Sequence, residues 1–284
     1  MTCYLFAGQG IQRKGMGKDL FHLFPNLISI ANTILGYDIE ALCVEDAFNQ
    51  LDQTEYTQPA IYVVNSLFYF KSLQEDAKPN ISFLAGHSLG EYNALLAAGV
   101  VDFETGLRLV KKRGELMSRS TSGTMAAIIG LTQEQVQLFL SKNNINNVEI
   151  ANYNSYTQVV ISGLKHDMIQ AQALFTQENK HTIVIPLRVD GPFHSSYMYQ
   201  VREEFASFLQ NFLFKPPLIP VLSNYTARPY TFSEIKKNLI EQITHPVRWV
   251  EIVEYVLKHK EAKFKEIGLS TILEKLINKI QNGQ

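Results

Sequence analysis

The sequence predicts an α/β protein in which a small domain is inserted into a larger one. Three observations support this prediction. Short apolar runs typical of buried strands alternate with helix-like segments along most of the chain. One such run ends at residues 86–90, Gly-His-Ser-Leu-Gly, and an apolar helix-like segment follows directly. Between residues 124 and 189 the order strand, helix, strand, strand, helix, strand is that of a ferredoxin-like unit.

The bulk composition excludes several classes of protein. The chain has 284 residues, of which 46% are hydrophobic and 19% charged, so a sizeable core is expected. A net charge of −1 gives no global attraction to nucleic acid or anionic membrane. The only cysteines, Cys3 and Cys43, lack the Cys-x-x-Cys spacing of a zinc site or a disulfide framework. Neither a signal peptide nor an apolar run of about 20 residues is present, so we expect a cytoplasmic protein.

The first part of the chain is predicted to supply two strands and four helices. Apolar runs predict strands at 4–7 and 81–85, and helical spacing predicts helices at 21–35, 58–73, 91–98 and 103–118. Pro59 is expected in the first turn of the second of these helices, where its missing N–H costs no hydrogen bond.

The inserted unit and the last third of the chain follow. In the unit we expect strands at 125–130, 148–151, 158–162 and 182–187, and helices at 132–143 and 165–179, with Thr132 as an N-cap. We assign residues 124–189 to this small domain, and residues 1–123 and 190–284 to one discontinuous large domain. Beyond the unit we expect a helix near 197–211, a strand at 219–222 and two helices between 233 and 259. A last helix is predicted to pack through Ile272, Leu276, Ile277 and Ile280.

Residues 86–90 fit the G-x-S-x-G turn that presents a nucleophilic serine in proteins of the α/β-hydrolase type. The two glycines permit a sharp turn that lifts the Ser88 hydroxyl clear of the sheet. The next helix points its N-terminus at the serine, so the N–H of Leu89 can donate to a developing oxyanion. The alternative is a tight strand–helix turn with an incidental serine. We therefore expect the large domain to be α/β-hydrolase-like.

A serine nucleophile needs a base, and the chain has seven histidines. His194 follows a Gly-Pro break where the chain returns to the large domain, and a loop there can aim a side chain at another site. His245 is the rival. The others lie in surface-like helices, in the small domain, or directly beside the serine in sequence: His22, His87, His166, His181 and His259.

An acid could complete a triad in the order serine, acid, histidine. The acids between Ser88 and His194 include Asp102, Asp167 and Asp190, and the sequence around them identifies none as the third member of a triad. The residues by themselves do not require a triad.

Arg113 is the third chemical signal. In the helix at 103–118, one apolar stripe is formed by Leu107, Val110, Gly114 and Met117. Arg113 lies in a second stripe between Leu109 and Leu116, so its side chain is expected to be partly buried. A buried guanidinium needs a carboxylate partner. That partner is either a protein Asp or Glu, or the free carboxylate of a diacid substrate.

Seven segments spread over nearly the whole chain together resemble one family. They occur in the same order as in the family that they resemble, the malonyl-CoA:acyl carrier protein transacylases of fatty acid synthesis and the acyltransferases of polyketide synthases. The segments are FAGQG at 6–10, TQPA at 57–60, GHSLGE at 86–91, RGELM at 113–117, NYNS at 152–155 with VVISG at 159–163, FHS at 193–195 and PVRW at 246–249.

The resemblance implies roles for the reacting groups. Ser88 would be the nucleophile and His194 its base. A backbone carbonyl at the position of Gln242, in place of an acid, would orient the histidine. Gln9 and the Leu89 N–H would form the oxyanion hole.

The resemblance also implies substrate contacts. Arg113 would bind the malonyl carboxylate, and Phe193 would leave little room for an α-methyl group. Asn152 and Asn154 of the small domain would contact the pantetheine arm or the acyl group across a cleft between the domains.

The implied reaction is ping-pong transfer of a malonyl group from malonyl-CoA to an acyl carrier protein, with no metal or other cofactor. A monomer is expected. Lys111 and Lys112 are candidates for carrier-protein docking, although two lysines on a helix are usually only a solvated face. The alternatives are an acyl hydrolase of the same fold, a general serine esterase and a catalytically silent binding protein. Arg113 argues against a hydrolase of neutral acyl chains.

Some positions depart from the family pattern. Ala7 stands in place of a proline, Ile11 in place of a serine and His245 in place of an asparagine, while Leu269-Ser270 replaces Pro-Gly. These departures suggest a specialised relative, such as the free-standing acyltransferases that serve modular polyketide synthases.

Overall fold

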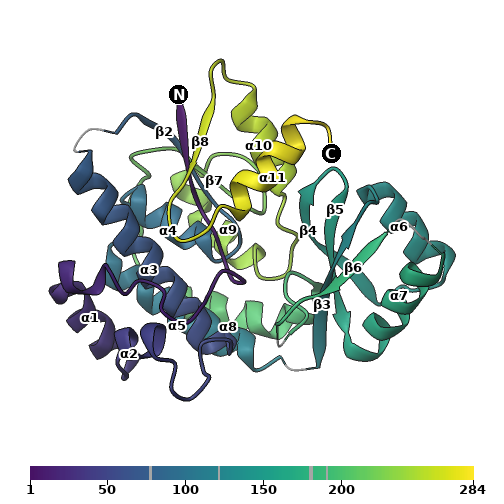
Figure 1. The fold of residues 1–284 in the computed structure, drawn as a ribbon, viewed down its shortest axis with the longest axis horizontal. Helices are drawn as coiled ribbons and strands as arrows, with labels where there is room; N and C mark the ends of the chain where they lie inside the picture. Colours follow the sequence, from purple (N-terminus) through teal and green to yellow (C-terminus); the bar gives the residue numbers. More distant parts are fainter. Residues whose placement is uncertain (77–78, 121, 179–181, 190) are drawn as a thin grey trace.

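Two four-stranded sheets, one parallel and one antiparallel, organise the chain (Figure 1). This computed structural model describes residues 1–76, 79–120, 122–178, 182–189 and 191–284. His181 and Asp190, both considered as site residues, lie outside them, as do the predicted end of one helix at 179 and the predicted domain boundary at 190. The predicted α/β class is confirmed.

The parallel sheet has the strand order β7-β2-β1-β8. Its strands are β1 (Thr2–Phe6), β2 (Ile81–Gly86), β7 (Val221–Leu222) and β8 (Lys263–Glu266). The two central strands, β1 and β2, are mostly buried, as expected of strands that are covered on both faces. The sequence did not predict β8, because its residues Lys-Phe-Lys-Glu carry the charges typical of an edge strand.

Helices surround this sheet in nearly the predicted positions (Figure 1). They are α1 (Pro25–Leu35), α2 (Ile39–Val44), α3 (Thr54–Glu75), α4 (Gly90–Ala97), α5 (Phe103–Ser118), α8 (Tyr199–Leu209), α9 (Ile235–Glu241), α10 (Trp249–Leu257) and α11 (Ile272–Gln281). The described ranges also contain three short 3₁₀ helices, at Phe21–Leu23, Ser196–Met198 and Phe232–Glu234. The short α2 was not predicted, whereas α5 has the predicted bounds.

The placement of Pro59 in a first turn is wrong. Helix α3 begins at Thr54, four residues before the predicted start, so Pro59 lies inside the helix. The Thr57 hydroxyl shares its one proton between Leu51 O at 2.6 Å and Gln53 O at 2.9 Å. These bonds stabilise the first turn ahead of the proline, and the pattern of apolar residues does not reveal them.

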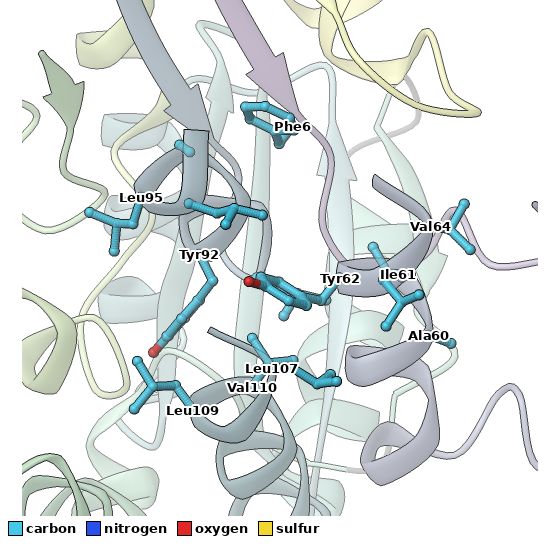
Figure 2. Close-up of a cluster of buried hydrophobic side chains, with 14 of the residues drawn as sticks. Phe6, Ala60, Ile61, Tyr62, Val64, Tyr92, Leu95, Leu107, Leu109 and Val110 are labelled. Carbon is cyan, nitrogen blue, oxygen red and sulfur yellow. The ribbon is translucent and has the colours of Figure 1, made fainter. Parts of the chain in front are cut away.

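Helices α3 and α5 pack closely because glycines of α5 face α3. A Cβ atom on Gly106 would lie 2.0 Å from the Tyr62 hydroxyl, and one on Gly114 would lie 3.2 Å from Thr54 O. Figure 2 shows the resulting core, in which Phe6 of β1, Tyr62 of α3 and Leu107 of α5 belong to one cluster. This close packing fixes the distance between α5 and α3, and with it the position of Arg113 on α5.

The antiparallel sheet has the strand order β4-β5-β3-β6. Helices α6 and α7 lie together on one side of it (Figure 1). The predicted N-cap is confirmed, because Thr132 and Gln135 form a capping box at the start of α6. The elements are β3 (Gly123–Ile129), α6 (Gln133–Lys142), β4 (Val148–Ser155), β5 (Gln158–Leu164), α7 (Lys165–Glu178) and β6 (Ile183–Pro186).

Strand β4 connects the antiparallel sheet to the last third of the chain. Tyr153 N donates to Val247 O and Val247 N donates to Ala151 O, both at 2.9 Å, so the segment before α10 pairs with the edge of β4. Helix α11 also contacts β4. Three of its predicted packing residues are buried: Leu276, Ile277 and Ile280. Ile272 is 48% exposed, so its predicted packing role is wrong.

Two further findings concern expected absences. In the part of the chain that the structure describes, no helix is long and apolar enough to span a membrane. The same residues contain no group of three or more His, Cys, Asp or Glu side chains that could hold a metal ion. Cys3 and Cys43 are both buried and free.

Candidate active site

Ser88 occupies a sharp turn between β2 and α4. Its φ of 50° lies in the left-handed region, which non-glycine residues adopt only when the surroundings enforce it. A Cβ atom on Gly86 would lie 1.9 Å from the carbonyl carbon of Gly90, and one on Gly90 would lie 2.0 Å from Phe6 O. Both positions therefore require glycine, and the turn carries Ser88 at the end of the central strands.

Asn224, which the sequence analysis did not identify, holds this turn. Its Oδ1 accepts from Ser88 N at 2.6 Å and its Nδ2 donates to Gly86 O at 2.7 Å. Asn224 follows β7, and β7 pairs in parallel with β2. Because neighbouring parallel strands end at the same edge of a sheet, a polar residue just after the predicted strand at 219–222 was the signal that could have identified it.

His194 lies beside the serine, although 106 residues separate them in sequence. Its Nε2 is 2.8 Å from Ser88 Oγ, and its Nδ1 is 2.8 Å from the backbone oxygen of Gln242. A carbonyl can only accept, so Nδ1 carries the proton and Nε2 is free to accept the hydroxyl proton of Ser88.

The electrostatic surroundings keep this imidazole neutral. Burial, and then the positive charge of Arg113, lower the pKa of His194 to about 3, against the weaker opposing effect of its bond to Gln242. His194 is therefore an uncharged proton acceptor at any physiological pH.

The other histidines that the structure describes do not bond to Ser88. The ring of His245, the rival base, bonds to Glu241 O at 2.8 Å and does not line the cavity at Ser88. His87 Nε2 lies 2.9 Å from Asn154 Oδ1. His22 and His166 are exposed, and His259 packs against Phe83.

No described acid completes a triad. The carboxylate of Asp102 caps α5 by accepting from Thr105 N at 2.7 Å, and Asp167 lies next to His166 on α7. The described contacts of the His194 ring are to Ser88 and to the Gln242 carbonyl. A backbone carbonyl, and not a carboxylate, thus orients the imidazole of His194.

Two backbone N–H groups next to Ser88 have no acceptor among the described residues. They belong to Leu89 and Gln9. A Cβ atom on Gly8 would lie 2.4 Å from His87 O, so the loop with Gln9 packs directly against the turn. The Gln9 side chain donates to Thr54 Oγ1 at 3.2 Å, which leaves its backbone N–H as the group that can serve an oxyanion.

Arg113 is buried, with 1% of its surface exposed. Its Nη1 donates to Gln58 Oε1 at 2.8 Å, and its Nη2 donates to Gln242 Oε1 and to Ser88 Oγ, both at 3.1 Å. No carboxylate of the described residues lies within ion-pair distance of it. The guanidinium is instead held by two amide oxygens and directed at the serine.

These groups open into a cavity of about 280 Å³ between the two sheets. Ser88, His194 and Arg113 line it from the side of the parallel sheet, and Asn152 and Asn154 from the antiparallel sheet. Its wall includes Phe193, which is buried, and the exposed Ile272 together with Ile11. Ile272 is therefore a cavity residue that the helical pattern had assigned to the core.

Lys111 and Lys112, the candidates for docking, do not line this cavity. Lys111 Nζ donates to Ile34 O at 2.9 Å, and both ammonium groups lie 3.9 Å from Glu115. Their charges are thus already partly engaged on the surface of α5.

Comparison with known proteins adds three kinds of similarity. Residues 3–279 match the family described as acyl transferase domain. The chain is 49% identical over 282 residues to the polyketide biosynthesis malonyl CoA-acyl carrier protein transacylase PksC of Bacillus subtilis (strain 168), covering 99% of this chain and 97% of that protein.

Solved structures give the same result. The crystal structure of a malonyl CoA-acyl carrier protein transacylase from Burkholderia pseudomallei superposes with a TM-score of 0.96 at 43% identity, covering 100% of this chain and 99% of that one. A malonyl-transacylase solved in complex with its type II polyketide synthase acyl-carrier protein has a TM-score of 0.92 at 33% identity, with coverage of 99% and 93%.

Proposed function

This chain belongs to the acyl transferase domain family, and we propose that it transfers a malonyl group from malonyl-CoA to the phosphopantetheine thiol of an acyl carrier protein. The observation that carries the proposal is Arg113, a buried cation 3.1 Å from the serine hydroxyl with no described carboxylate to pair with it. Such a group stabilises a ligand that brings its own carboxylate. Malonyl has one at the far end of its acyl group, whereas acetyl does not.

In the first half-reaction, His194 Nε2 removes the proton from Ser88 as Oγ attacks the thioester carbonyl of malonyl-CoA. The Leu89 and Gln9 N–H groups donate to the oxyanion that forms. Collapse of this intermediate breaks the carbon–sulfur bond, and His194 returns its proton to the departing CoA thiolate. The product is a malonyl ester on Ser88.

In the second half-reaction the pantetheine thiol of the carrier protein gives its proton to His194 and attacks the ester carbonyl. The carbon–oxygen bond breaks, and Ser88 regains its proton from His194. His194 starts each half-reaction neutral, which suits a pKa held at about 3. Every proton is carried by a group of this chain.

The acyl group would extend from Ser88 towards Arg113, past the ring of Phe193. Because Phe193 is buried and lines the cavity, an α-methyl group would have to displace it. The pantetheine arm would lie along the antiparallel sheet, within reach of Asn152 and Asn154. PksC is named for polyketide biosynthesis, and we assign this chain to the same kind of pathway.

The proposal includes the finer organisation of the fold. The strand order β4-β5-β3-β6, with the connections β3-α6-β4-β5-α7-β6, supports a ferredoxin-like unit at 124–189. The parallel sheet with its serine turn supports an α/β-hydrolase-like large domain made of residues 1–123 and 190–284.

The alternative is an acyl hydrolase, in which water replaces the carrier-protein thiol. Intact-protein mass spectrometry after incubation with malonyl-CoA, acetyl-CoA or methylmalonyl-CoA distinguishes the two. We expect a malonyl adduct on wild type, no adduct on Ser88→Ala, and transfer of the adduct to an added holo acyl carrier protein. An adduct that disappears equally fast with and without the carrier protein would establish the hydrolase instead.

A further inference from the structure

Beneath Ser88 lies a buried carboxylate that the reaction does not touch. Glu91, three residues after the serine in the first turn of α4, is 0% exposed. Its Oε1 accepts from Asn224 N at 3.0 Å and from the Tyr230 hydroxyl at 2.6 Å. Its Oε2 accepts from Gln242 Nε2. Three donors therefore converge on one carboxylate.

Two of these three donors belong to residues that hold the reacting groups. Asn224 binds the backbone of the serine turn on both sides of His87, through Ser88 N and Gly86 O. Gln242 binds His194 through its backbone oxygen, Arg113 through Oε1 and Ser88 O through Nε2. Among the side chains that the structure describes, Glu91 is thus the one that hydrogen-bonds to both Asn224 and Gln242.

The direction of each bond shows why a carboxylate is needed here. Gln242 Oε1 faces the guanidinium of Arg113, so its Nε2 must face Glu91. A carboxylate can only accept, and it satisfies Gln242, Asn224 and Tyr230 together. An amide in its place would set an N–H₂ group against either the Asn224 N–H or the Gln242 N–H₂.

The network also supplies a countercharge for Arg113. Glu91 acts on the guanidinium through the intervening amide of Gln242, and the N–H groups of Arg113 that face Ser88 keep no carboxylate partner. A direct ion pair would occupy those N–H groups. The protein thus retains a buried cation in the absence of substrate without blocking its access to a substrate carboxylate.

We propose that Glu91 is a positioning residue for acyl transfer. As a carboxylate it fixes Asn224 and Gln242, and these two residues hold Ser88, His194 and Arg113 in their relative positions. The inference rests on the proposed function, because it concerns the same dyad. It adds a residue that contacts neither acyl donor nor acceptor.

Glu91 also gives the site a pH dependence that its base does not. Burial raises the pKa of Glu91 to about 7, against the opposing effects of Tyr230, Asn224, Gln242 and Arg113. The titratable or charged groups around it are Tyr230, Tyr92 and Arg113. Protonation removes the countercharge of Arg113, so reactivity should fall as the pH decreases through 7. His194, with its pKa of about 3, cannot produce that change.

The test measures the rate at which a fluorophosphonate probe labels Ser88, which requires neither malonyl-CoA nor carrier protein. For Glu91→Gln we expect labelling about 100-fold slower than wild type at pH 8, because small displacements of a catalytic group cost rates of this order. The matched control is Glu104→Gln, the same change at an exposed first-turn glutamate of α5. Equal rates for folded Glu91→Gln and wild type would overturn the role.

Tyr230→Phe keeps the inference testable if Glu91→Gln fails to fold. It removes one bond that favours the carboxylate, so the acid limb of the labelling rate should move up by about one pH unit. If Tyr230 were purely structural, Tyr230→Phe would change the labelling rate but not the pH at which labelling becomes slow. An unchanged pH midpoint in Tyr230→Phe would therefore contradict the proposal. Absence of labelling in wild type would contradict the acylation chemistry itself, which separates the two failures.

Discussion

Replacing Arg113 with Ala should convert a malonyl-selective protein into one that accepts acetyl groups comparably well. The guanidinium is buried and its Nη2 lies 3.1 Å from Ser88 Oγ, so a malonyl carboxylate bound there pairs with it away from water. Losing one partner of such a buried pair costs about 2–5 kcal/mol. The ratio of malonyl to acetyl transfer should therefore fall by about 30-fold to about 5,000-fold.

The ratio matters because Arg113 has other contacts. Its loss also leaves the amide oxygens of Gln58 and Gln242 without their donor, which slows both substrates. Competition between malonyl-CoA and acetyl-CoA, read as adducts on Ser88 by mass spectrometry, cancels this shared effect. Arg108→Ala is the matched control, since Arg108 lies on the exposed face of the same helix and pairs with Glu104 at 2.8 Å. A malonyl preference that survives in Arg113→Ala would refute the proposed carboxylate site.

Two further predictions concern the neighbours of Ser88. Phe193→Ala should reduce the preference for malonyl over methylmalonyl by about tenfold or more, because a methyl group in a packed pocket costs about 1–3 kcal/mol. An unchanged ratio of the two adducts in the same competition assay would show that another residue excludes the methyl group. His194→Ala should change how stability depends on pH. Since burial lowers the pKa of His194 to about 3, the unfolded chain binds one more proton between about pH 6.5 and pH 3, and wild type loses stability as the pH falls through that window. The slope of the unfolding free energy against pH, from urea titrations at several pH values, should therefore be smaller in His194→Ala by about 1.4 kcal/mol per pH unit; identical slopes would mean that the histidine is not held neutral by burial.

Most elements could be predicted because they depend on short stretches of sequence. Helix α5 has the predicted bounds, and Thr132 caps α6, since both follow from apolar spacing and from side chains that bond within one turn. The missed strand β8 has the opposite property. Strand β8 exists because β1 offers it a parallel partner, and its Lys-Phe-Lys-Glu sequence has no strand-like apolar pattern.

The site divides in the same way. The turn at Ser88 was evident from the sequence, because only glycine fits at positions 86 and 90 and that restriction leaves a visible motif. Which histidine would face the serine was less evident, and the resemblance to a family favoured His194 over His245. The exposure of Ile272 and its place in the cavity wall were not predictable, because helical spacing does not say what covers a face.

The sequence by itself determined the α/β class, the serine turn and the presence of a buried arginine, all of which depend on local spacing. Only the tertiary structure decided what surrounds that arginine. Its acceptors, Gln58 and Gln242, lie 55 and 129 residues away in the chain, and Asn224 bonds to Ser88 across 136 residues. Contacts at such separations are set by the packing of sheets and helices, and no periodicity in the sequence records which side chains they bring together.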